Sequence, residues 1–192
     1  MTEVPDSRQK EDGVSAALAL AKTAEVPPSA PDFAAAYDAE FESVWLYLRR
    51  LGVPAADVED AVHDVFVVAH RRYATYDSSR PLRPWLLGIA FRVAAQWRRQ
   101  RRHEVDLDEP AREMADGAPG PEADFESREV SSQLHAALGQ LDLHQRAVVV
   151  MHDLHGIAVP QIADELNVPL NTVYSRLRLG RAKVAAVLRG NS

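Results

Sequence analysis

Near the end of the chain, four polar side chains recur at a spacing that places them on one face of a helix. Val173 and Leu177, four residues apart, are expected to point inward from this helix. The opposite face then carries, at positions i, i+3, i+4 and i+7, Asn171, Tyr174, Ser175 and Arg178. Amide, hydroxyl and guanidinium groups on an outward helix face can hydrogen-bond to base edges in the major groove of DNA. The alternative is an ordinary solvated face.

The segment before this helix predicts the first half of a helix-turn-helix. Ile162, Ala163 and Leu166 form one apolar stripe, and Pro160 suits the first turn of a helix. Asn167 stands where the turn requires a residue that tolerates the left-handed conformation. The complete motif favours DNA binding over a solvated face, with Arg181 extending the polar face and Arg176 flanking it.

A second group of cations lies in the middle of the chain, beside Phe91 and Trp97. Five arginines occur there within eleven residues: Arg92, Arg98, Arg99, Arg101 and Arg102. Arginine next to an aromatic ring binds phosphate and stacks on bases. A basic helix end could instead offset its own dipole, but one or two arginines would do that.

The segment Val58–Arg72 predicts a helix with two different faces. Its inner stripe is apolar and regular, and Asp57 is expected to cap its N-terminus. Its outer face is acidic but includes Val67 and Val68, which makes it partly apolar. This composition fits a protein-binding surface, and the alternative is a solvated face with two stray valines, which is common.

These elements predict an all-α fold of two small helical domains joined by an acidic, flexible linker. Residues 1–31 are expected to form a disordered N-terminal tail, residues 32–103 the first domain and residues 128–192 the second. The linker, residues 104–127, holds nine acidic residues and one basic residue. The linker therefore sums to −8, and the rest of the chain sums to +2 although the whole chain has a net charge of −6.

Within the domains, glycine and proline indicate where helices begin and end. The first helix is expected to end at Gly52, and a loop over Thr75–Pro84 should precede a helix that begins at Trp85. Gly180 costs a helix about 1 kcal/mol relative to alanine, which favours an end or bend there.

Several classes of function are not supported. The chain has no cysteine, which excludes disulfides and thiolate metal sites, and no nucleotide-binding or zinc-protease motif occurs. His152 and His155 have no evident third ligand, so no metal is expected. We expect no cofactor and no enzymatic activity. No apolar run of about 18 residues occurs and the N-terminus lacks a signal pattern, so we expect a cytoplasmic protein without membrane insertion.

In their order along the chain, these motifs resemble regions 2 and 4 of the extracytoplasmic-function sigma factors of bacterial RNA polymerase. The resemblance covers about residues 33–103 and 130–189. The region 2-like part has an acidic helix, a proline-containing loop, W-L-x-x-I-A from Trp85 and the arginine run. The region 4-like part has I-A-x-x-L-x-V-P-x-x-T-V-x-S-R-L from Ile162. The resemblance implies a subunit that binds core polymerase, recognises the −10 and −35 promoter elements and assists promoter melting.

The resemblance also implies roles for individual residues. Those on the helix that docks on the clamp helices of the largest polymerase subunit are Asp57, Glu59, Asp60, Asp64 and Val67. A second set binds the −10 element, from the loop that captures a flipped base and from the helix that holds the strands. It comprises Tyr76, Asp77, Ser78, Arg80, Arg83, Arg92, Trp97, Arg98, Arg99 and Arg102. Those on the −35 recognition helix are Asn171, Thr172, Tyr174, Ser175, Arg176 and Arg178.

The expected partners are core polymerase, through the clamp helices and the flap of the second-largest subunit, and promoter DNA; an anti-sigma factor is a further candidate. The chain departs from the family pattern at Tyr174, where a basic residue is common, at Phe91 and Arg92, where Arg and Asn are common, and at Gln96, where Asp is common. Its −35 preference should therefore differ from that of its relatives.

Two other functions remain open: a stand-alone helix-turn-helix regulator, which predicts a dimer on a palindrome, and an adaptor that uses the acidic helix.

Overall fold

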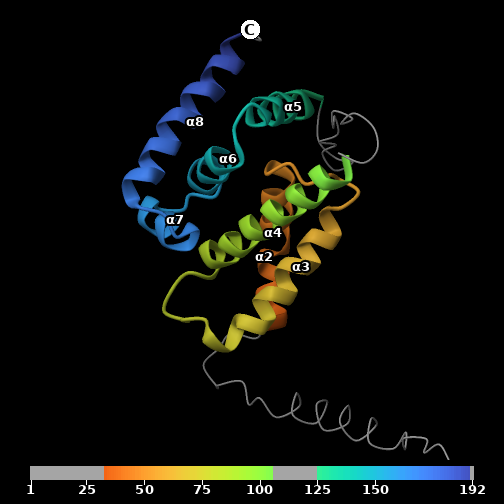
Figure 1. Cartoon of the computed structure of the whole chain (residues 1–192), viewed down its shortest axis with the longest axis vertical. Helices are drawn as coiled ribbons and strands as arrows, with labels where there is room; N and C mark the ends of the chain where they lie inside the picture. Colours follow the sequence, from red (N-terminus) through yellow and green to blue (C-terminus); the bar gives the residue numbers. More distant parts are fainter. Residues whose placement is uncertain (1–32, 106–124, 191–192) are drawn as a thin grey trace, which may run out of the picture. The chain divides into compact units, whose positions relative to one another are not determined.

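Helices make up the regular structure of the part of the chain that the computed structural model describes, residues 33–105 and 125–190 (Figure 1). The first group comprises α2 (Phe33–Arg50), α3 (Val58–Arg72), the short 3-10 helix η1 (Tyr73–Thr75) and α4 (Leu82–Val105). The second comprises α5 (Phe125–Gly139), α6 (Leu143–Val149), the π-helical turn η2 (Val150–Leu154), α7 (Val159–Leu166) and α8 (Leu170–Gly190). No strand occurs in these residues, which confirms the all-α fold class. The predicted tail and most of the linker lie outside the described residues.

The apolar stripe of α3 packs inward as the sequence predicts. Its six stripe residues, from Val58 to Ala69, are buried against α2 and α4. Gly52 adopts φ 91° directly after α2 and ends that helix, and the backbone N–H of Val53 donates to the carbonyl of Leu48 at 3.1 Å. The periodicity of α3 therefore identifies the core-facing side correctly.

Two details at helix ends differ from the sequence expectation. Asp57 stands at the N-cap of α3, but its side chain makes no capping hydrogen bond and instead pairs with Arg101 of α4 at 3.4 Å. Helix α4 begins at Leu82 rather than Trp85, so Pro84 lies in its first turn, where a missing N–H costs no hydrogen bond.

The helix-turn-helix forms as predicted. Asn167 ends α7 in the left-handed conformation, with φ 52° and ψ 54°. Val173 and Leu177 of α8 are buried. Helix α8 continues through Gly180 without ending there, and Gly180 is buried where α8 comes close to α6. A methyl group at position 180 would lie 2.6 Å from Cγ2 of Val149 in α6.

The two helical groups pack against each other in this structure. Helix α4 contacts α7, and α2 contacts η2. The buried guanidinium of Arg146 in α6 donates to the carbonyl of Leu51, which follows α2, at 3.3 Å. The same guanidinium donates to the carbonyls of Gly139 and Leu141 at 3.0 and 3.2 Å. These bonds offset part of the cost of burying a charge.

None of the helices in the described ranges combines the length and apolar character that a membrane span requires.

Candidate nucleic-acid interface

The predicted polar face of α8 is exposed. Asn171, Ser175 and Arg178 lie on the surface, and Tyr174 is 54% exposed. Thr172 and Arg176 are half-buried at the edge of this face. Because Val173 and Leu177 hold the opposite side of the helix in the core, the polar side chains point away from the protein.

The polar face of α8 is also free of internal partners. Among the side chains that the structure describes, residues 33–101 and 132–190, no hydrogen bond or ion pair engages the side chain of Tyr174 or Arg178. Arg181 differs, because it forms an ion pair with Asp153 of η2, and its Nε donates to Oδ2 at 2.9 Å. Arg181 therefore ties α8 to η2 and does not extend the free face as the sequence suggested.

The loop before α4 is held by its own side chains. The carboxylate of Asp77 accepts hydrogen bonds from the backbone N–H of Ser79 at 3.0 Å and from its hydroxyl at 2.7 Å. These two bonds lower the pKa of Asp77. The Tyr76 hydroxyl donates to the carbonyl of Arg80, and Ser78 is exposed.

Three aromatic rings line this loop. The Tyr76 ring lies stacked against Tyr73, with centroids 6.0 Å apart, and tilted against Trp85 at 4.8 Å. Burial raises the pKa of the Tyr76 hydroxyl. The loop thus carries a preformed aromatic surface next to cations.

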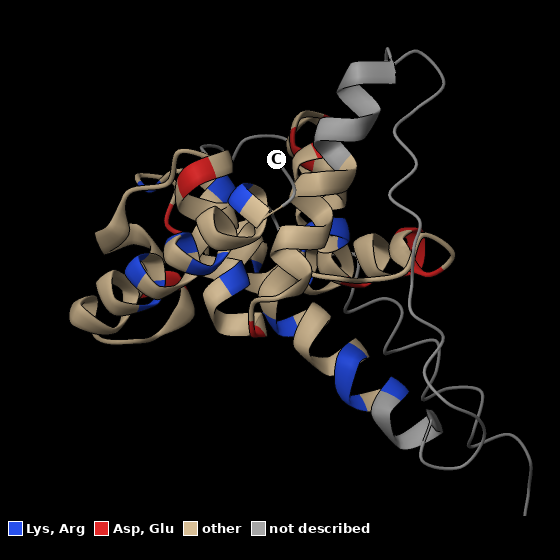
Figure 2. Ribbon diagram, turned by 90° about the horizontal axis from the view of Figure 1, so that it is seen from above, with Lys and Arg blue, Asp and Glu red and all other residues tan. Residues whose placement is uncertain are grey.

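The basic residues near the end of α4, visible in Figure 2, are largely engaged by neighbouring groups. Arg98 donates to the carbonyl of Leu51 at 3.3 Å, and the indole N–H of Trp97 donates to Asp64 of α3 at 3.2 Å. Arg99 is exposed, and the side chain of Arg102 lies outside the described residues. Earlier in the helix, Arg83 donates to Glu40 of α2 at 2.7 Å.

The acidic face of α3 is exposed next to this surface. Glu59, Asp60 and Asp64 lie on the surface, whereas Asp57 and Val67 are half-buried. Asp57 and Asp64 reach α4 through Arg101 and Trp97. The structure therefore places the predicted core-binding and −10-binding residues on adjacent helices.

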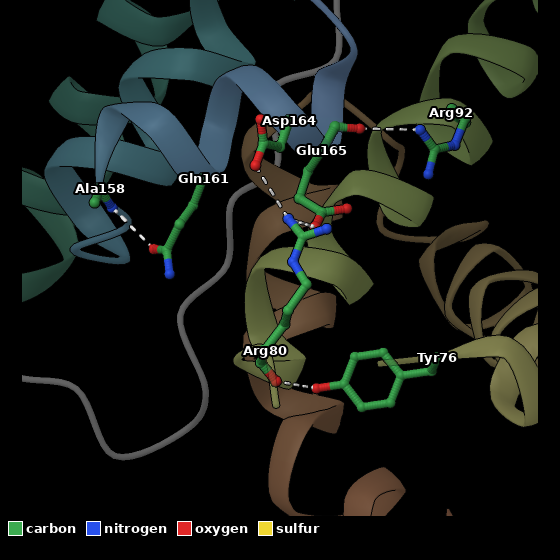
Figure 3. Close-up of polar contacts among 7 residues, drawn as sticks. All are labelled: Tyr76, Arg80, Arg92, Ala158, Gln161, Asp164 and Glu165. Atoms are coloured by element: carbon green, nitrogen blue, oxygen red, sulfur yellow. Dashed lines mark hydrogen bonds and ion pairs between the residues drawn. The ribbon is translucent and has the colours of Figure 1, made fainter. Parts of the chain in front are cut away.

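Two further arginines contact the helix-turn-helix instead (Figure 3). Arg80 pairs with Asp164 at 3.3 Å and with Glu165 at 3.1 Å, both in α7. Arg92 donates to the backbone carbonyl of Glu165 at 3.1 Å. Loss of water lowers the pKa of Arg92 and raises that of Glu165, although Arg80 and Arg92 oppose the rise.

The sequence did not identify Asp164 and Glu165 as residues that meet this surface. Their only signal is two acidic residues at the end of an amphipathic helix, which is common on solvated helix faces. A single sequence does not show which partner helix they contact.

Comparisons with known proteins agree with this geometry. The family model for Sigma-70 region 2 matches residues 37–104, and the model for Sigma-70, region 4 matches residues 131–184. The chain is 32% identical over 149 residues to the RNA polymerase sigma factor NccH of Alcaligenes xylosoxydans xylosoxydans, covering 74% of this chain and 79% of that protein. It is 28% identical over 141 residues to the ECF RNA polymerase sigma-E factor of Escherichia coli strain K12, covering 69% of this chain and 74% of that protein.

Solved structures show the same arrangement of helices. The sigma factor RpoE of Bartonella quintana, in complex with the anti-sigma factor NepR, has a TM-score of 0.72 at 20% identity, covering 82% of this chain and 97% of that chain; this similarity shows a shared fold. CnrH, in complex with the cytosolic domain of CnrY, has a TM-score of 0.59 at 27% identity, covering 83% of this chain and 89% of that chain. The chain therefore belongs to the extracytoplasmic-function sigma factors, the RNA polymerase subunits of the sigma-70 family that direct initiation at specific promoters.

Proposed function

We propose that this sigma factor uses three surfaces, two that bind promoter DNA and one that binds core polymerase. The α8 face reads the −35 element, the loop before α4 together with α4 holds the −10 element, and the outer face of α3 docks on the polymerase clamp helices. The observation that carries the proposal is the α8 face, which is exposed, anchored by buried Val173 and Leu177, and free of internal partners at Tyr174 and Arg178.

On α8, each side chain has a distinct chemical use. Arg178 can donate two hydrogen bonds to a guanine edge, and Asn171 can pair with an adenine edge. Tyr174 can donate to a phosphate or place its ring against a thymine methyl group. Ser175 and Thr172 hydrogen-bond to bases or phosphates, and Arg176 contacts the backbone.

At the −10 element, the aromatic surface of Tyr76 and Trp85 accepts a base that has left the stack. Unstacking a base costs a few kcal/mol, which aromatic stacking of about 1–3 kcal/mol per base can offset. Asp77, Ser78, Arg80 and Arg83 surround this surface. The strands are then held along α4 by Arg92, Trp97, Arg98, Arg99 and Arg102.

At the polymerase, the α3 surface combines acid with a small apolar contribution from Val67. Glu59, Asp60 and Asp64 provide charge complementarity to a basic partner surface, with Asp57 at the start of the helix. The second predicted domain, residues 128–192, meets the flap of the second-largest subunit, and the acidic linker, residues 104–127, connects it to the first predicted domain, residues 32–103.

The protein acts by binding, and the polymerase supplies the chemistry. It works in the cytoplasm, where its partners are found. CnrH, whose fold this chain shares, has been solved in complex with the cytosolic domain of CnrY. From the similarity to CnrH we infer that an anti-sigma factor controls the present protein as well.

Run-off transcription with core polymerase tests the proposal. A library of promoter templates is transcribed by core polymerase with and without the purified protein, and transcripts that start at defined promoters are expected only with it. If the library yields no dependent transcript, the proposal fails. Tight binding of promoter duplex by the protein alone, as a dimer on a palindrome, would instead indicate a stand-alone regulator.

A further inference from the structure

The aromatic surface of the −10 loop continues into the core as a chain of rings. The ring of Tyr76 lies between those of Trp85 and Tyr73, with centroids 4.8 and 6.0 Å away. Tyr73 is only 8% exposed, and its ring in turn lies edge-on to that of Phe33 at 5.1 Å. Because Phe33 is the first residue of α2, this chain of rings connects the start of α2 with the loop before α4.

Phe33 is held in place by α3. Its ring lies edge-on to that of buried Phe66 at 6.4 Å and to that of His70 at 5.0 Å, and both of these residues belong to α3. Edge-to-face pairs with centroids about 4.5–7 Å apart are favourable, because the positive edge of one ring meets the negative face of the other. These contacts fix the position of the Phe33 ring, which therefore gives Tyr73 a firm support.

Tyr73 links this support to the loop. It begins η1, and its carbonyl accepts a hydrogen bond from the backbone N–H of Tyr76 at 3.1 Å. The planes of the two tyrosine rings differ by only 14°. Within the loop, the Tyr76 hydroxyl donates to the carbonyl of Arg80 (Figure 3). The Tyr76 ring is thus held at its hydroxyl by Arg80 and on the core side by Tyr73.

A ring that is already in place binds a base more tightly than a ring that must first be ordered. Ordering a mobile side chain on binding costs conformational entropy, which reduces the affinity that its contacts provide. Stacking also requires the ring and the base to lie in close contact, so a displaced ring loses part of the attraction. The residues that support Tyr76 are therefore expected to affect −10 binding without touching DNA.

We propose that Phe33 is a positioning residue for −10 recognition: through Tyr73, it holds the ring of Tyr76 where that ring stacks on the unstacked base. This inference rests on the proposed −10 role of Tyr76. It gives the first turn of α2 a part in DNA binding. The alternative is that Phe33 only fills the core, in which case its loss would affect stability alone.

Tyr37 provides a matched control on the same helix. It follows Phe33 by about one helical turn, and its ring lies 4.4 Å from that of Phe66. Its other ring contact in the described part of the chain is with Phe41, and it makes none with Tyr73. Loss of either ring therefore removes a contact with Phe66, but only loss of Phe33 removes the support of Tyr73.

The experiment measures how tightly the full-length protein binds single-stranded DNA. The probe is a short fluorescent single strand of random sequence at low salt, because stacking on an aromatic ring does not require a given base. We expect Phe33→Leu to bind about threefold more weakly than Tyr37→Leu, whereas Phe33→Tyr, which keeps the ring, should bind as the wild type does. The salt dependence of binding should be the same in all three variants, because none of them removes a phosphate contact.

A double variant shows whether Phe33 acts through Tyr76. Tyr76→Leu should weaken binding, and adding Phe33→Leu to it should cause no further loss, because the ring that Phe33 supports is already absent. A residue that acts only on overall stability would lower the affinity by the same factor in both backgrounds. Thermal unfolding of each variant measures that stability separately. If Phe33→Leu does not fold, Phe33→Met, which also lacks a ring, takes its place.

The outcomes separate this inference from the proposed function. If Tyr76→Leu binds the probe as tightly as the wild type does, the proposed −10 role of the loop fails, and the positioning role fails with it. If Tyr76→Leu binds weakly but Phe33→Leu and Tyr37→Leu bind equally well, only the positioning role is wrong. The same conclusion holds if the losses multiply in the double variant.

Discussion

The two surfaces that we propose bind promoter DNA, the α8 face and the −10 surface formed by α4 and the loop before it, differ in the state of their cations. On α8, Arg178 projects from an exposed helix face without an internal partner. On the −10 surface, Arg80, Arg83 and Arg92 are engaged by acceptors from other helices. The residues are chemically alike, so the difference comes from what the fold places opposite them.

This difference indicates that the surfaces become available in different ways. The α8 face needs no rearrangement, because its orientation is set by buried residues behind it. The −10 surface must exchange internal partners for phosphate, which reduces the net free energy gained from each new contact. The same number of arginines is therefore expected to give weaker binding on the −10 surface of the free protein.

The largest effect is expected on the open surface. Arg178→Ala should reduce run-off transcription from a −35-dependent promoter by about 5- to 150-fold, because one guanidinium-to-base contact contributes about 1–3 kcal/mol. Arg181→Ala is the matched control, since that arginine already pairs with Asp153, and it should change transcription less than about twofold. If both variants lost the same amount of transcription, the absence of an internal partner at Arg178 would not explain its contribution.

Acid should weaken the packing that keeps the −10 surface occupied. Burial, with smaller contributions from Arg50 and Arg83, lowers the pKa of His155 to about 4, and its ring lies against Tyr47. A depressed folded-state pKa means that the unfolded state binds more protons between about pH 6.5 and 4. The stability contribution of neutral His155 is complete above about pH 6.5 and is lost as pH falls toward 4.

His155 is only partly buried, so solvent screening reduces the effect of its pKa shift on stability. We expect a loss of about 1–2 kcal/mol in the free energy of unfolding over this pH range. Urea unfolding of the wild type and of His155→Gln at a series of pH values measures it. The wild-type curve should fall more steeply over this range. Parallel curves for the two proteins would exclude His155 as the cause.

Gly180→Ala tests what holds the open surface in place. The added methyl group would meet Cγ2 of Val149, and overpacking typically costs about 1–3 kcal/mol. Alanine also favours the helix over glycine by about 1 kcal/mol. We therefore expect a net loss on the order of 1 kcal/mol in the free energy of unfolding, measured by thermal unfolding. Gly190→Ala, where no atom lies within contact distance of an added methyl group, should be neutral or stabilising. A stabilising Gly180→Ala would contradict the close approach of α8 and α6.

The smallest effect is expected at Arg92, where two changes offset each other. Arg92→Ala removes one phosphate contact and also one contact to Glu165. Affinity for single-stranded DNA should change less than about threefold, whereas the salt dependence should lose about 0.7 in slope. Arg92→Lys should retain the wild-type slope. A large loss of affinity with an unchanged slope would show that Arg92 does not contact phosphate.

Local features of the fold could be predicted from the sequence. The stripe of α3 and the left-handed turn at Asn167 depend on periodicity and on backbone preference, which neighbouring residues determine. The outward face of α8 follows from two buried positions on the same helix. These predictions succeeded because each uses residues within one or two turns of one another.

The contact between α4 and α7 could not be predicted in the same way. Periodicity shows that a face is buried or exposed, but it does not identify the helix opposite. From the sequence alone, Gly180 indicates an end or bend in its helix, whereas in the structure it permits a close approach to Val149. Arg146, to which the sequence assigned no role, is held in the core by three backbone carbonyls. The roles of the site residues stay predictions until the variants are measured.

The central claim is that the two helical groups bind separate promoter elements, which requires them to move apart on core polymerase, and the distance between the groups tests it most directly. Cysteines introduced at the exposed residues Ala35 and Ala186 carry a donor and an acceptor dye, and energy transfer is measured in the free protein and after addition of core polymerase. We expect a single high-transfer state in the free protein that is lost on binding core polymerase. An unchanged transfer efficiency in a transcriptionally active complex would contradict the claim.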